Sequence, residues 1–197
     1  SGLVGSEAVN FFSKKKFSIV GIDNNYRKKF FGNGGDITKQ TRKNLKTYKK
    51  FSYYNFDICN LYKLKNLFKK YKFDYILHAA AQPSHDWAKN NIDLDFNINA
   101  NATLNLLNLM RRFCPKAAFV YVSTNKVYGS NPNNLKYYEF KNRFDIKKKS
   151  PYFHGINEKM SLDNTIHSFF GASKLSADII TQEFGKNLNL KTAVFRA

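Results

Sequence analysis

Short apolar runs alternate along the chain with longer segments whose apolar residues recur at helical spacing. Buried strands are expected at Phe17 to Ile22, Phe51 to Phe56, Tyr75 to Leu77, Ala117 to Val122 and Lys191 to Phe195. Strand and helix signals that alternate in this way are typical of a parallel sheet wrapped by helices. The pattern therefore predicts an α/β fold with a doubly wound parallel sheet.

Helical segments occupy most of the intervals between these strands. The sequence predicts helices at about Ser6 to Phe12, Thr38 to Lys50, Leu61 to Tyr71, Leu94 to Phe113 and Ser173 to Gly185, the second of them from a polar, helix-capable stretch rather than from apolar spacing. Together with the strands, they account for most of the chain.

One long stretch, from about Gly129 to Ser161, is polar and shows no clean period. Loops of that length inside compact domains are usually functional or mobile. We expect no regular element there, apart from a turn at Asn131 to Asn134.

The composition is strongly basic, with 33 Lys and Arg against 14 Asp and Glu and a formal net charge of +19. Clustered lysines neutralise nucleic-acid phosphates, so a basic stripe on one face would favour that function. The lysines are instead scattered in short runs, and the joint abundance of Lys, Asn, Phe, Tyr and Ile is typical of an A/T-rich coding sequence. A charge run is usually a solvated surface, so no nucleic-acid partner is predicted.

Other bulk features exclude further classes. No apolar run approaches the roughly 20 residues of a membrane span, and no signal peptide is visible. The two cysteines, Cys59 and Cys114, have neither metal-binding nor redox spacing. We therefore expect a cytoplasmic protein with no membrane segment and no metal site.

The first candidate for chemistry is the turn Gly2-Leu3-Val4-Gly5, which opens a helical pattern. Glycines there let a backbone approach a pyrophosphate, and the helix N-terminus supplies oriented N–H groups. Asp23 ends the next strand, eighteen residues after Gly5, where a carboxylate grips adenosine ribose hydroxyls. An acid there repels a 2′-phosphate and so favours NAD over NADP, although Arg27 lies close by.

Two further positions extend this predicted cofactor site. Asn24 follows Asp23, and Asp57-Ile58 follows the next strand, where it would flank the adenine. Asp57 is equally suited to cap the N-terminus of the helix that follows, and both interpretations stay open.

The glycine turn also bears on the organisation of the chain. A phosphate-binding turn normally follows the first strand of a doubly wound sheet, and Ser1 already lies in that turn. We expect that strand to belong between the strand ending at Asp23 and the one ending at His78. Residues 1–197 are accordingly interpreted as one dinucleotide-binding domain truncated at both ends, without a C-terminal substrate lobe. Two strands without their partner would leave backbone groups unpaired, so the isolated chain is expected to aggregate or to bind no dinucleotide.

A second candidate site joins Ser123-Thr124, at the end of a strand, to Lys174, some fifty residues later. Ligands bind at the carboxyl ends of strands in open α/β sheets. A hydroxyl there can hydrogen-bond a substrate alcohol, and a lysine can grip a ribose and lower the pKa of a nearby phenol.

These positions belong to a longer ordered set. The chain carries Gly2-x-x-Gly5, Asp23, His78-x-Ala80-Ala81, Asn99-x-x-x-Thr103-x-Asn105-Leu106-Leu107, Ser123-Thr124-x-x-Val127-Tyr128-Gly129 and Lys174. The set covers nearly the whole chain and resembles the extended short-chain dehydrogenase/reductase family, Rossmann-like proteins that include sugar-nucleotide epimerases and dehydratases. Within that family the block from Ser123 to Gly129 looks most like the CDP-paratose (CDP-tyvelose) 2-epimerase group.

The resemblance implies NAD-dependent epimerisation of a nucleotide-activated sugar, a CDP- or UDP-sugar, by transient oxidation to a ketone and re-reduction from the other face. Such a reaction would feed polysaccharide biosynthesis. The resemblance also implies a homodimer formed through the helices that hold Asn99 and Lys174.

The resemblance further implies roles for individual residues. Lys174 would hold the nicotinamide ribose and tune the base, Thr124 would hydrogen-bond the reacting oxygen, and Asn99 would organise a helix and a water near Lys174. Residues expected to line the dinucleotide are Ala79, Ala80, Ala81 and Ser123, and those expected to contact substrate are Gln82, Ser84, Asn125 and His167.

Two departures from the family pattern change this picture. The family's Tyr-x-x-x-Lys pair needs a phenol four residues before Lys174, where this chain has Phe170. A phenyl ring exchanges no proton, so three interpretations compete: another base such as His167, Tyr152 or His154, a catalytically silent protein that binds NAD and a sugar nucleotide, or altered, slow chemistry.

The second departure concerns the residues directly after the catalytic Thr. Dehydratases of the family carry an Asp-Glu pair there, whereas this chain has Asn125 and Lys126. Neither is a carboxylate, so the sequence disfavours a 4,6-dehydratase.

Overall fold

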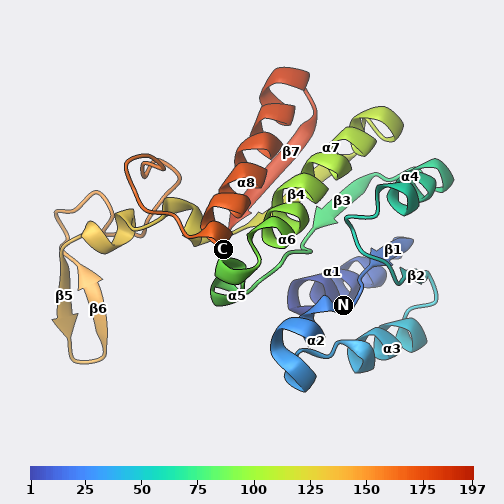
Figure 1. Ribbon diagram of the computed structural model, residues 1–197, viewed down its shortest axis with the longest axis horizontal. Coiled ribbons are helices and arrows are strands. Elements are labelled where there is room, and N and C mark those ends of the chain that lie inside the picture. The colour runs from blue at the N-terminus through green and yellow to red at the C-terminus, as the bar shows by residue number, and fades with distance from the viewer.

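The computed structural model describes residues 1–197, and its five parallel strands form two separate groups. β1 (Ile19–Ile22) pairs with β2 (Phe51–Tyr54), while β4 (Ala118–Ser123) lies between β3 (Tyr75–His78) and β7 (Lys191–Arg196). Each of these strands falls within or next to an apolar run that predicted it. Alternating strands and helices give the expected α/β, Rossmann-like fold (Figure 1).

Helices connect the strands, and the longer ones form in segments that the sequence predicts to be helical. They are α1 (Leu3–Lys14), α3 (Thr38–Thr47), α4 (Leu61–Lys70), α7 (Ala102–Phe113) and α8 (Phe169–Leu188). Three short helices were not predicted as separate elements: α2 (Tyr26–Phe31), α5 (His85–Asn90) and α6 (Ile92–Phe96). None of the helices is both long and apolar enough to cross a lipid bilayer.

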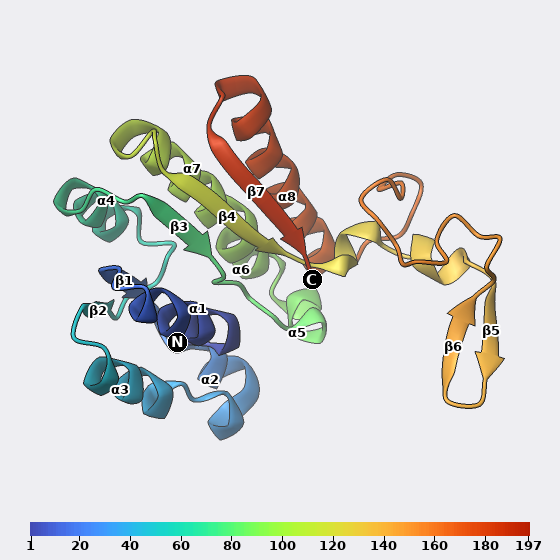
Figure 2. The ribbon, with the colours of Figure 1, turned by 180° about the vertical axis from the view of Figure 1, so that it is seen from behind.

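The largest core lies between β4 and the helices on one side of it. Figure 2 shows α7 and α8 behind β4 and β7. Fully buried Phe119 and Tyr121 of β4 pack with Leu107 and Met110 of α7 and with Ala177 of α8. This packing fixes α8 against the end of β4.

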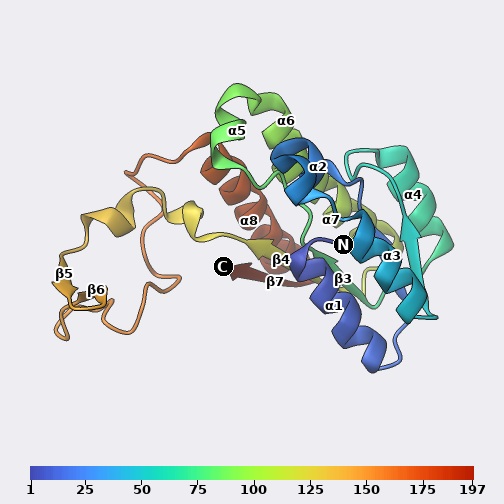
Figure 3. The same ribbon diagram turned by 90° about the horizontal axis from the view of Figure 1, so that it is seen from below.

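A gap separates β1 from β3. Each strand pairs on one side only, β1 with β2 and β3 with β4, so two edges without hydrogen bonds between them face one another. Figure 3 shows α1 beside this gap, next to β3. Each of the two strands therefore has one edge whose backbone groups have no strand partner.

Two expectations about the C-terminal half were wrong. The last helix begins at Phe169 rather than Ser173, because the Ser168 hydroxyl caps it by accepting a hydrogen bond from the Gly171 N–H at 3.0 Å. The stretch expected to be irregular contains an antiparallel hairpin, β5 (Tyr137–Phe140) and β6 (Arg143–Ile146), which projects from the body of the molecule (Figure 1). Its turn at residues 141–142 has no glycine to signal it.

The segment predicted as one helix from Leu94 to Phe113 is interrupted by a π-helical turn, Asn97–Asn101. Such turns widen a helix locally and often occur at functional sites. Here the turn carries Asn99, which is 1% exposed and faces α8.

Candidate functional site

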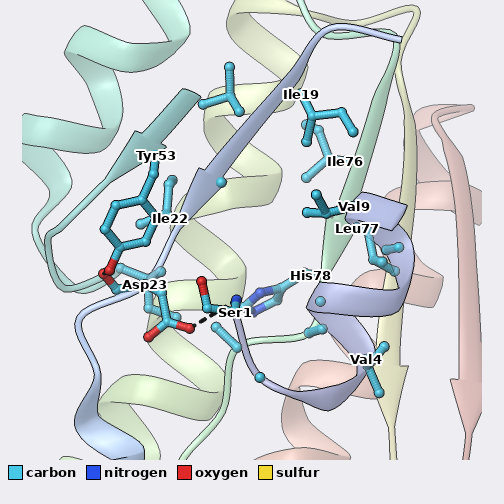
Figure 4. A pocket seen from close by; sticks show the side chains of 18 of the residues that line it. Ser1, Val4, Val9, Ile19, Ile22, Asp23, Tyr53, Ile76, Leu77 and His78 are labelled. Carbon is cyan, nitrogen blue, oxygen red and sulfur yellow. Dashed lines mark hydrogen bonds and ion pairs between the residues drawn. The ribbon is translucent and has the colours of Figure 1, made fainter. Parts of the chain in front are cut away.

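A cavity of about 520 Å³ lies between β1, β3 and the first turns of α1. Figure 4 shows Asp23 towards one end of it, with Ile19, Ile76 and Leu77 along its length. The cavity brings together most of the residues predicted to bind a dinucleotide: Gly2, Gly5, Asp23, Asn24, Asp57, Ile58, Ala79, Ala80 and Ala81. Four segments that are distant in sequence therefore share one opening.

The N-terminus of α1 is open to a ligand. Its N-cap residue is Gly2, and no side chain caps the first turn. The first N–H groups of a helix have no partner within the helix, so an uncapped turn offers donors and a positive dipole end to an anion. A Cβ built on Gly2 or Gly5 would meet no protein atom within 4 Å. This part of the structure therefore fits a pyrophosphate.

Asp23 lies at the carboxyl end of β1, with its side chain 25% exposed. One carboxylate oxygen accepts from the Asn25 N–H at 2.8 Å, which holds the side chain in place. The anchored and partly exposed carboxylate suits the gripping of ribose hydroxyls. Arg27 stacks on Phe31, 5.0 Å from the ring centre, rather than pairing with this acid.

Asn24 and Asp57 tie the ends of β1 and β2 together. The Asn24 side-chain amide donates to Asp57 at 3.1 Å, and the other Asp57 oxygen accepts from the Cys59 N–H at 2.8 Å. The interpretation of Asp57 as a helix cap is wrong, because Asn60 caps α4 by accepting from the Lys63 N–H at 3.0 Å.

Ser123 and Lys174 do not line the cavity but lie at the end of β4. The Lys174 residue is 4% exposed, and its Nζ donates to the Val122 carbonyl at 2.7 Å. That Nζ also lies 4.3 Å from the centre of the Tyr121 ring. Burial lowers the pKa of Lys174 to about 8, although the carboxylates of Asp178 and Asp95 oppose the shift.

A buried ion pair holds Ser123 in place. Ser123 donates to Asp178 at 2.7 Å, and Arg196 donates to both Asp178 oxygens at 2.9 and 3.0 Å. Burial opposes ionisation of Asp178, yet the hydrogen bonds from Arg196, Ser123 and Gln182 lower its pKa. The Arg196 guanidinium also lies 5.2 Å from the ring centre of Tyr128, which links β7 and α8 to the turn after β4.

A second buried network surrounds Asn99. Its side-chain amide donates to Ser173 at 3.0 Å and to Asp95 at 3.1 Å, while Ser173 donates to Asp95 at 2.5 Å. Burial raises the pKa of Asp95, and its hydrogen bonds from Ser173 and Gln82 oppose that shift. Asn99 is thereby tied to Ser173, the residue directly before Lys174.

Two residues expected to contact substrate have other partners in this structure. Gln82 is 0% exposed, and its side chain donates to Asp95 at 2.8 Å and to the Ser84 carbonyl at 2.8 Å. The Ser84 hydroxyl caps α5 by accepting from the Trp87 N–H at 3.2 Å. The Gln82 side chain therefore belongs to the buried network, and its contact with substrate stays a prediction.

The turn that follows Thr124 at the end of β4 packs against the first turn of α8, which carries Phe170. The Thr124 hydroxyl accepts from the Lys126 N–H at 3.3 Å and donates to Asn125 at 3.3 Å. A Cβ built on Gly171 would lie 2.9 Å from the Lys126 carbonyl, so the turn after Thr124 touches the first turn of α8. Phe170 is half-buried there, one helical turn before Lys174 and on the same face.

His167 is tied to its own loop. Its Nε2 lies 3.0 Å from the Leu162 carbonyl, and because a carbonyl only accepts, Nε2 carries the proton. Its Nδ1 is buried without a hydrogen-bond partner.

Sequence reasoning missed Asp95, Asp178 and Arg196 as members of the site. Two of these had a usable signal, since Asp95 lies four residues before Asn99 and Asp178 four residues after Lys174. Residues at that spacing share a helix face, so each acid was an expected neighbour. Arg196 had no such signal, because it reaches α8 only through the pairing of β7 with β4.

A parallel sheet, a glycine-opened helix and an acid at the end of the next strand define the Rossmann-like class of dinucleotide-binding proteins. The chain belongs to the NAD dependent epimerase/dehydratase family, whose model matches residues 1–197. The predicted resemblance to sugar-nucleotide epimerases and dehydratases is thereby confirmed.

Individual relatives agree with this assignment. The chain is 31% identical over 195 residues to a CDP-paratose 2-epimerase of Salmonella typhi, covering 99% of this chain and 54% of the relative. It is 27% identical over 198 residues to a UDP-glucuronate 4-epimerase of Thermodesulfobacterium geofontis, covering 100% of this chain and 52% of the relative. The chain thus spans about half the length of these relatives.

Among solved structures, the UDP-Glc/GlcNAc 4-epimerase of Campylobacter jejuni superposes with a TM-score of 0.74 at 22% identity. The match covers 99% of this chain and 50% of that structure. It confirms the fold.

Proposed function

We propose that this chain supplies the NAD site and the central catalytic residues for epimerisation of a nucleotide-activated sugar, a CDP- or UDP-sugar. The observation that carries the proposal is the meeting of the Gly2–Gly5 turn, Asp23 and the 79–81 segment around one cavity. The relationship to a CDP-paratose 2-epimerase supports the substrate class and favours a CDP-sugar. Asn125 and Lys126, which lack carboxylates, weigh against dehydration.

Bound NAD would supply an acceptor for the hydride of a sugar carbinol and a donor for its return to the opposite face of the ketone. The uncapped first turn of α1 would bind the pyrophosphate, and Asp23 the adenosine ribose. At the end of β4, the Thr124 hydroxyl would hydrogen-bond the reacting oxygen. Asn99 would fix the first turns of α8 through Ser173, and so the position of Lys174.

Phe170 supports one alternative from a different class. A protein without a proton acceptor at this position could bind NAD and a sugar nucleotide without turning the sugar over. Such a protein would act as a sensor or scaffold and would carry the same cavity. The two functions differ in turnover alone.

The discriminating experiment uses the protein expressed from the whole reading frame that contains residues 1–197. CDP- and UDP-sugars are added to the NAD-loaded protein, beside a Phe170→Tyr variant, and epimers and transient NADH are measured. Epimer formation by the wild type supports the enzyme. Transient NADH in the Tyr variant alone supports the silent protein, and a protein that binds no NAD contradicts both.

We also expect this protein to form a homodimer through α7 and α8. Leu104 of α7 and Ile179 of α8 are 36% and 45% exposed, which leaves apolar surface on both helices. Sedimentation of the same protein tests the expectation, and a monomer at micromolar concentration contradicts it.

A further inference from the structure

The group that accepts the sugar's hydroxyl proton is the open question left by Phe170, and its answer rests on the proposed function. The base must lie near Thr124, at the end of β4, because Thr124 is the group proposed to hold the reacting oxygen. It must also present a lone pair that is not already used within the protein.

The three side chains suggested by the sequence do not meet the positional condition. His167 has an Nδ1 without a hydrogen-bond partner, but its Nε2 is tied to the Leu162 carbonyl in the loop before α8. Tyr152 packs in a cluster with Val127 and Met160, and His154 is an exposed residue that stacks on its neighbour Phe153. None of them is part of α8 or of the end of β4.

Lys174 meets the positional condition. Its Nζ is hydrogen-bonded to the carbonyl of Val122, two residues before Thr124, at 2.7 Å. It lies one helical turn after Phe170, so the amine occupies the helix face on which a phenol at 170 would stand. The single recorded hydrogen bond uses one N–H, which leaves the lone pair of a neutral amine without a protein partner.

The charges around this amine do not lock it in the ammonium form. Lys174 makes no ion pair, since Asp178 is held by Arg196 and Asp95 by Ser173. Two side chains of the sheet face the Lys174 amine, the Tyr121 ring and His78. Burial lowers the pKa of His78 to about 3, so the imidazole stays neutral. The desolvation of Lys174 accordingly brings its pKa to about 8, and a usable fraction of the amine is neutral near neutral pH.

We propose that the Lys174 amine is itself the proton acceptor of this protein, in place of the phenol that Phe170 lacks. Bound NAD would supply the hydride acceptor for oxidation of the sugar carbinol to a ketone and the hydride donor for its re-reduction. Lys174 would accept the proton released when the sugar O–H bond breaks, forming an N–H bond, and would return that proton to the sugar oxygen in the reverse step, so that nothing is consumed.

The proposal is tested first by Lys174→Arg, which keeps the positive charge but cannot release a proton at pH 8. We expect hydride transfer to fall at least about 100-fold, as for the loss of a general base, with NAD affinity changed only a few-fold. The wild-type rate should rise with pH up to about 8, and in a Phe170→Tyr background the Arg substitution should be less damaging. Lys186→Arg, an exposed position on the same helix, is the matched control.

A second measurement is independent of turnover and of any variant. The cofactor-free wild-type protein is labelled with trace acetic anhydride across a pH series, and the label on Lys174 is quantified by mass spectrometry. Half-maximal reactivity near pH 8 is expected, against about 10.4 for a lysine in a model peptide.

Four outcomes overturn the inference. A Lys174→Arg variant within about threefold of the wild-type rate does so, as does a labelling midpoint near the model-peptide value of about 10.4. Loss of hydride transfer in His167→Asn but not in Lys174→Arg would assign the base to His167. A wild type that binds NAD but shows neither epimer nor transient NADH overturns the proposed function as well, whereas the first three outcomes leave that function standing.

Discussion

The cofactor-facing region and the region beneath β4 are built in opposite ways. Around the cavity the polar groups include backbone N–H groups of α1 and the partly exposed Asp23. A Cβ added at Gly2 or Gly5 would contact no other part of the protein. Around Lys174 the polar groups are buried side chains that satisfy one another, with Asp178 and Thr103 both 0% exposed. The cavity region therefore has polar groups that are free to bind a ligand, whereas the polar side chains of the buried region are hydrogen-bonded to one another.

Because the two regions differ in this way, substitutions in them should have different effects, on ligand binding in the cavity region and on stability in the buried network. A change at the cavity should alter what the protein binds while leaving its fold intact, because no protein atom depends on the changed group. A change in the buried network should damage the fold first, because it leaves a polar partner without a hydrogen bond. The following predictions test that separation.

The largest effect is expected for the 197-residue chain by itself. The facing edges of β1 and β3 carry unpaired backbone groups, and such edges pair with other chains. We predict that the isolated chain aggregates or binds no dinucleotide, as measured by light scattering and NAD titration. A monodisperse chain that unfolds in one cooperative step would contradict this prediction.

In the buried region, Asp178→Ala should lower the free energy of unfolding by about 3–5 kcal/mol, the usual loss when one partner of a buried ion pair is removed. Arg196 and Ser123 would both lose their acceptor. Urea unfolding of the protein from the whole reading frame measures the effect. Asp86→Ala, which removes a fully exposed carboxylate beside His85, is the control and should destabilise far less. Equal losses for the two variants would contradict the separation.

His78 should make the protein acid-sensitive. Its pKa is about 3 in the folded chain, because of burial, against about 6.5 when exposed. As pH falls below about 6.5 the unfolded chain binds a proton that the folded chain does not, so stability is lost progressively down to about pH 3. At pH 5 the loss should be about 2 kcal/mol.

His78→Gln should remove that slope between pH 7 and pH 5 in urea unfolding. Replacing the exposed His154 in the same way should not change the slope. If the slope persists in His78→Gln, the acid sensitivity has another origin.

The smallest effect on stability is expected in the cavity region. Gly5→Ala adds a methyl group to α1 where no protein atom lies within 4 Å, and alanine favours a helix by up to about 1 kcal/mol. Stability should therefore be unchanged or slightly higher, while the dissociation constant for NAD rises at least tenfold.

Gly185→Ala in α8 is the matched opposite of Gly5→Ala. A Cβ at position 185 would collide with the Thr192 hydroxyl, so the substitution should destabilise the protein. The affinity of the molecules that remain folded for NAD should not change. Calorimetry and NAD titration of both variants decide the comparison, and weakened stability in Gly5→Ala would contradict it.

Local patterns predicted most of the fold. The strands from β1 to β4 and the helices α1, α4 and α7 follow apolar spacing that is visible within ten to twenty residues of sequence. The hairpin of β5 and β6 escaped prediction because its turn lacks glycine, and the start of α8 escaped because Ser168 was not recognised as its cap.

The same division holds for the candidate site. The residues at the cavity were predictable because the glycine turn and the strand-end acid are short motifs with a physical reason behind each position. The buried network was not, because its contacts join residues distant in sequence, such as Ser173 with Asp95 and Ser123 with Asp178. Only folding brings these groups together.

The proposed epimerase is tested by the absorbance of reduced nicotinamide after a nucleotide sugar is mixed rapidly with the NAD-loaded protein from the whole reading frame. We expect a transient rise that decays as the epimer forms, with no net consumption of NAD and with a rate that depends on Lys174. A protein that holds NAD and sugar nucleotide but shows neither the rise nor the epimer would contradict the proposal.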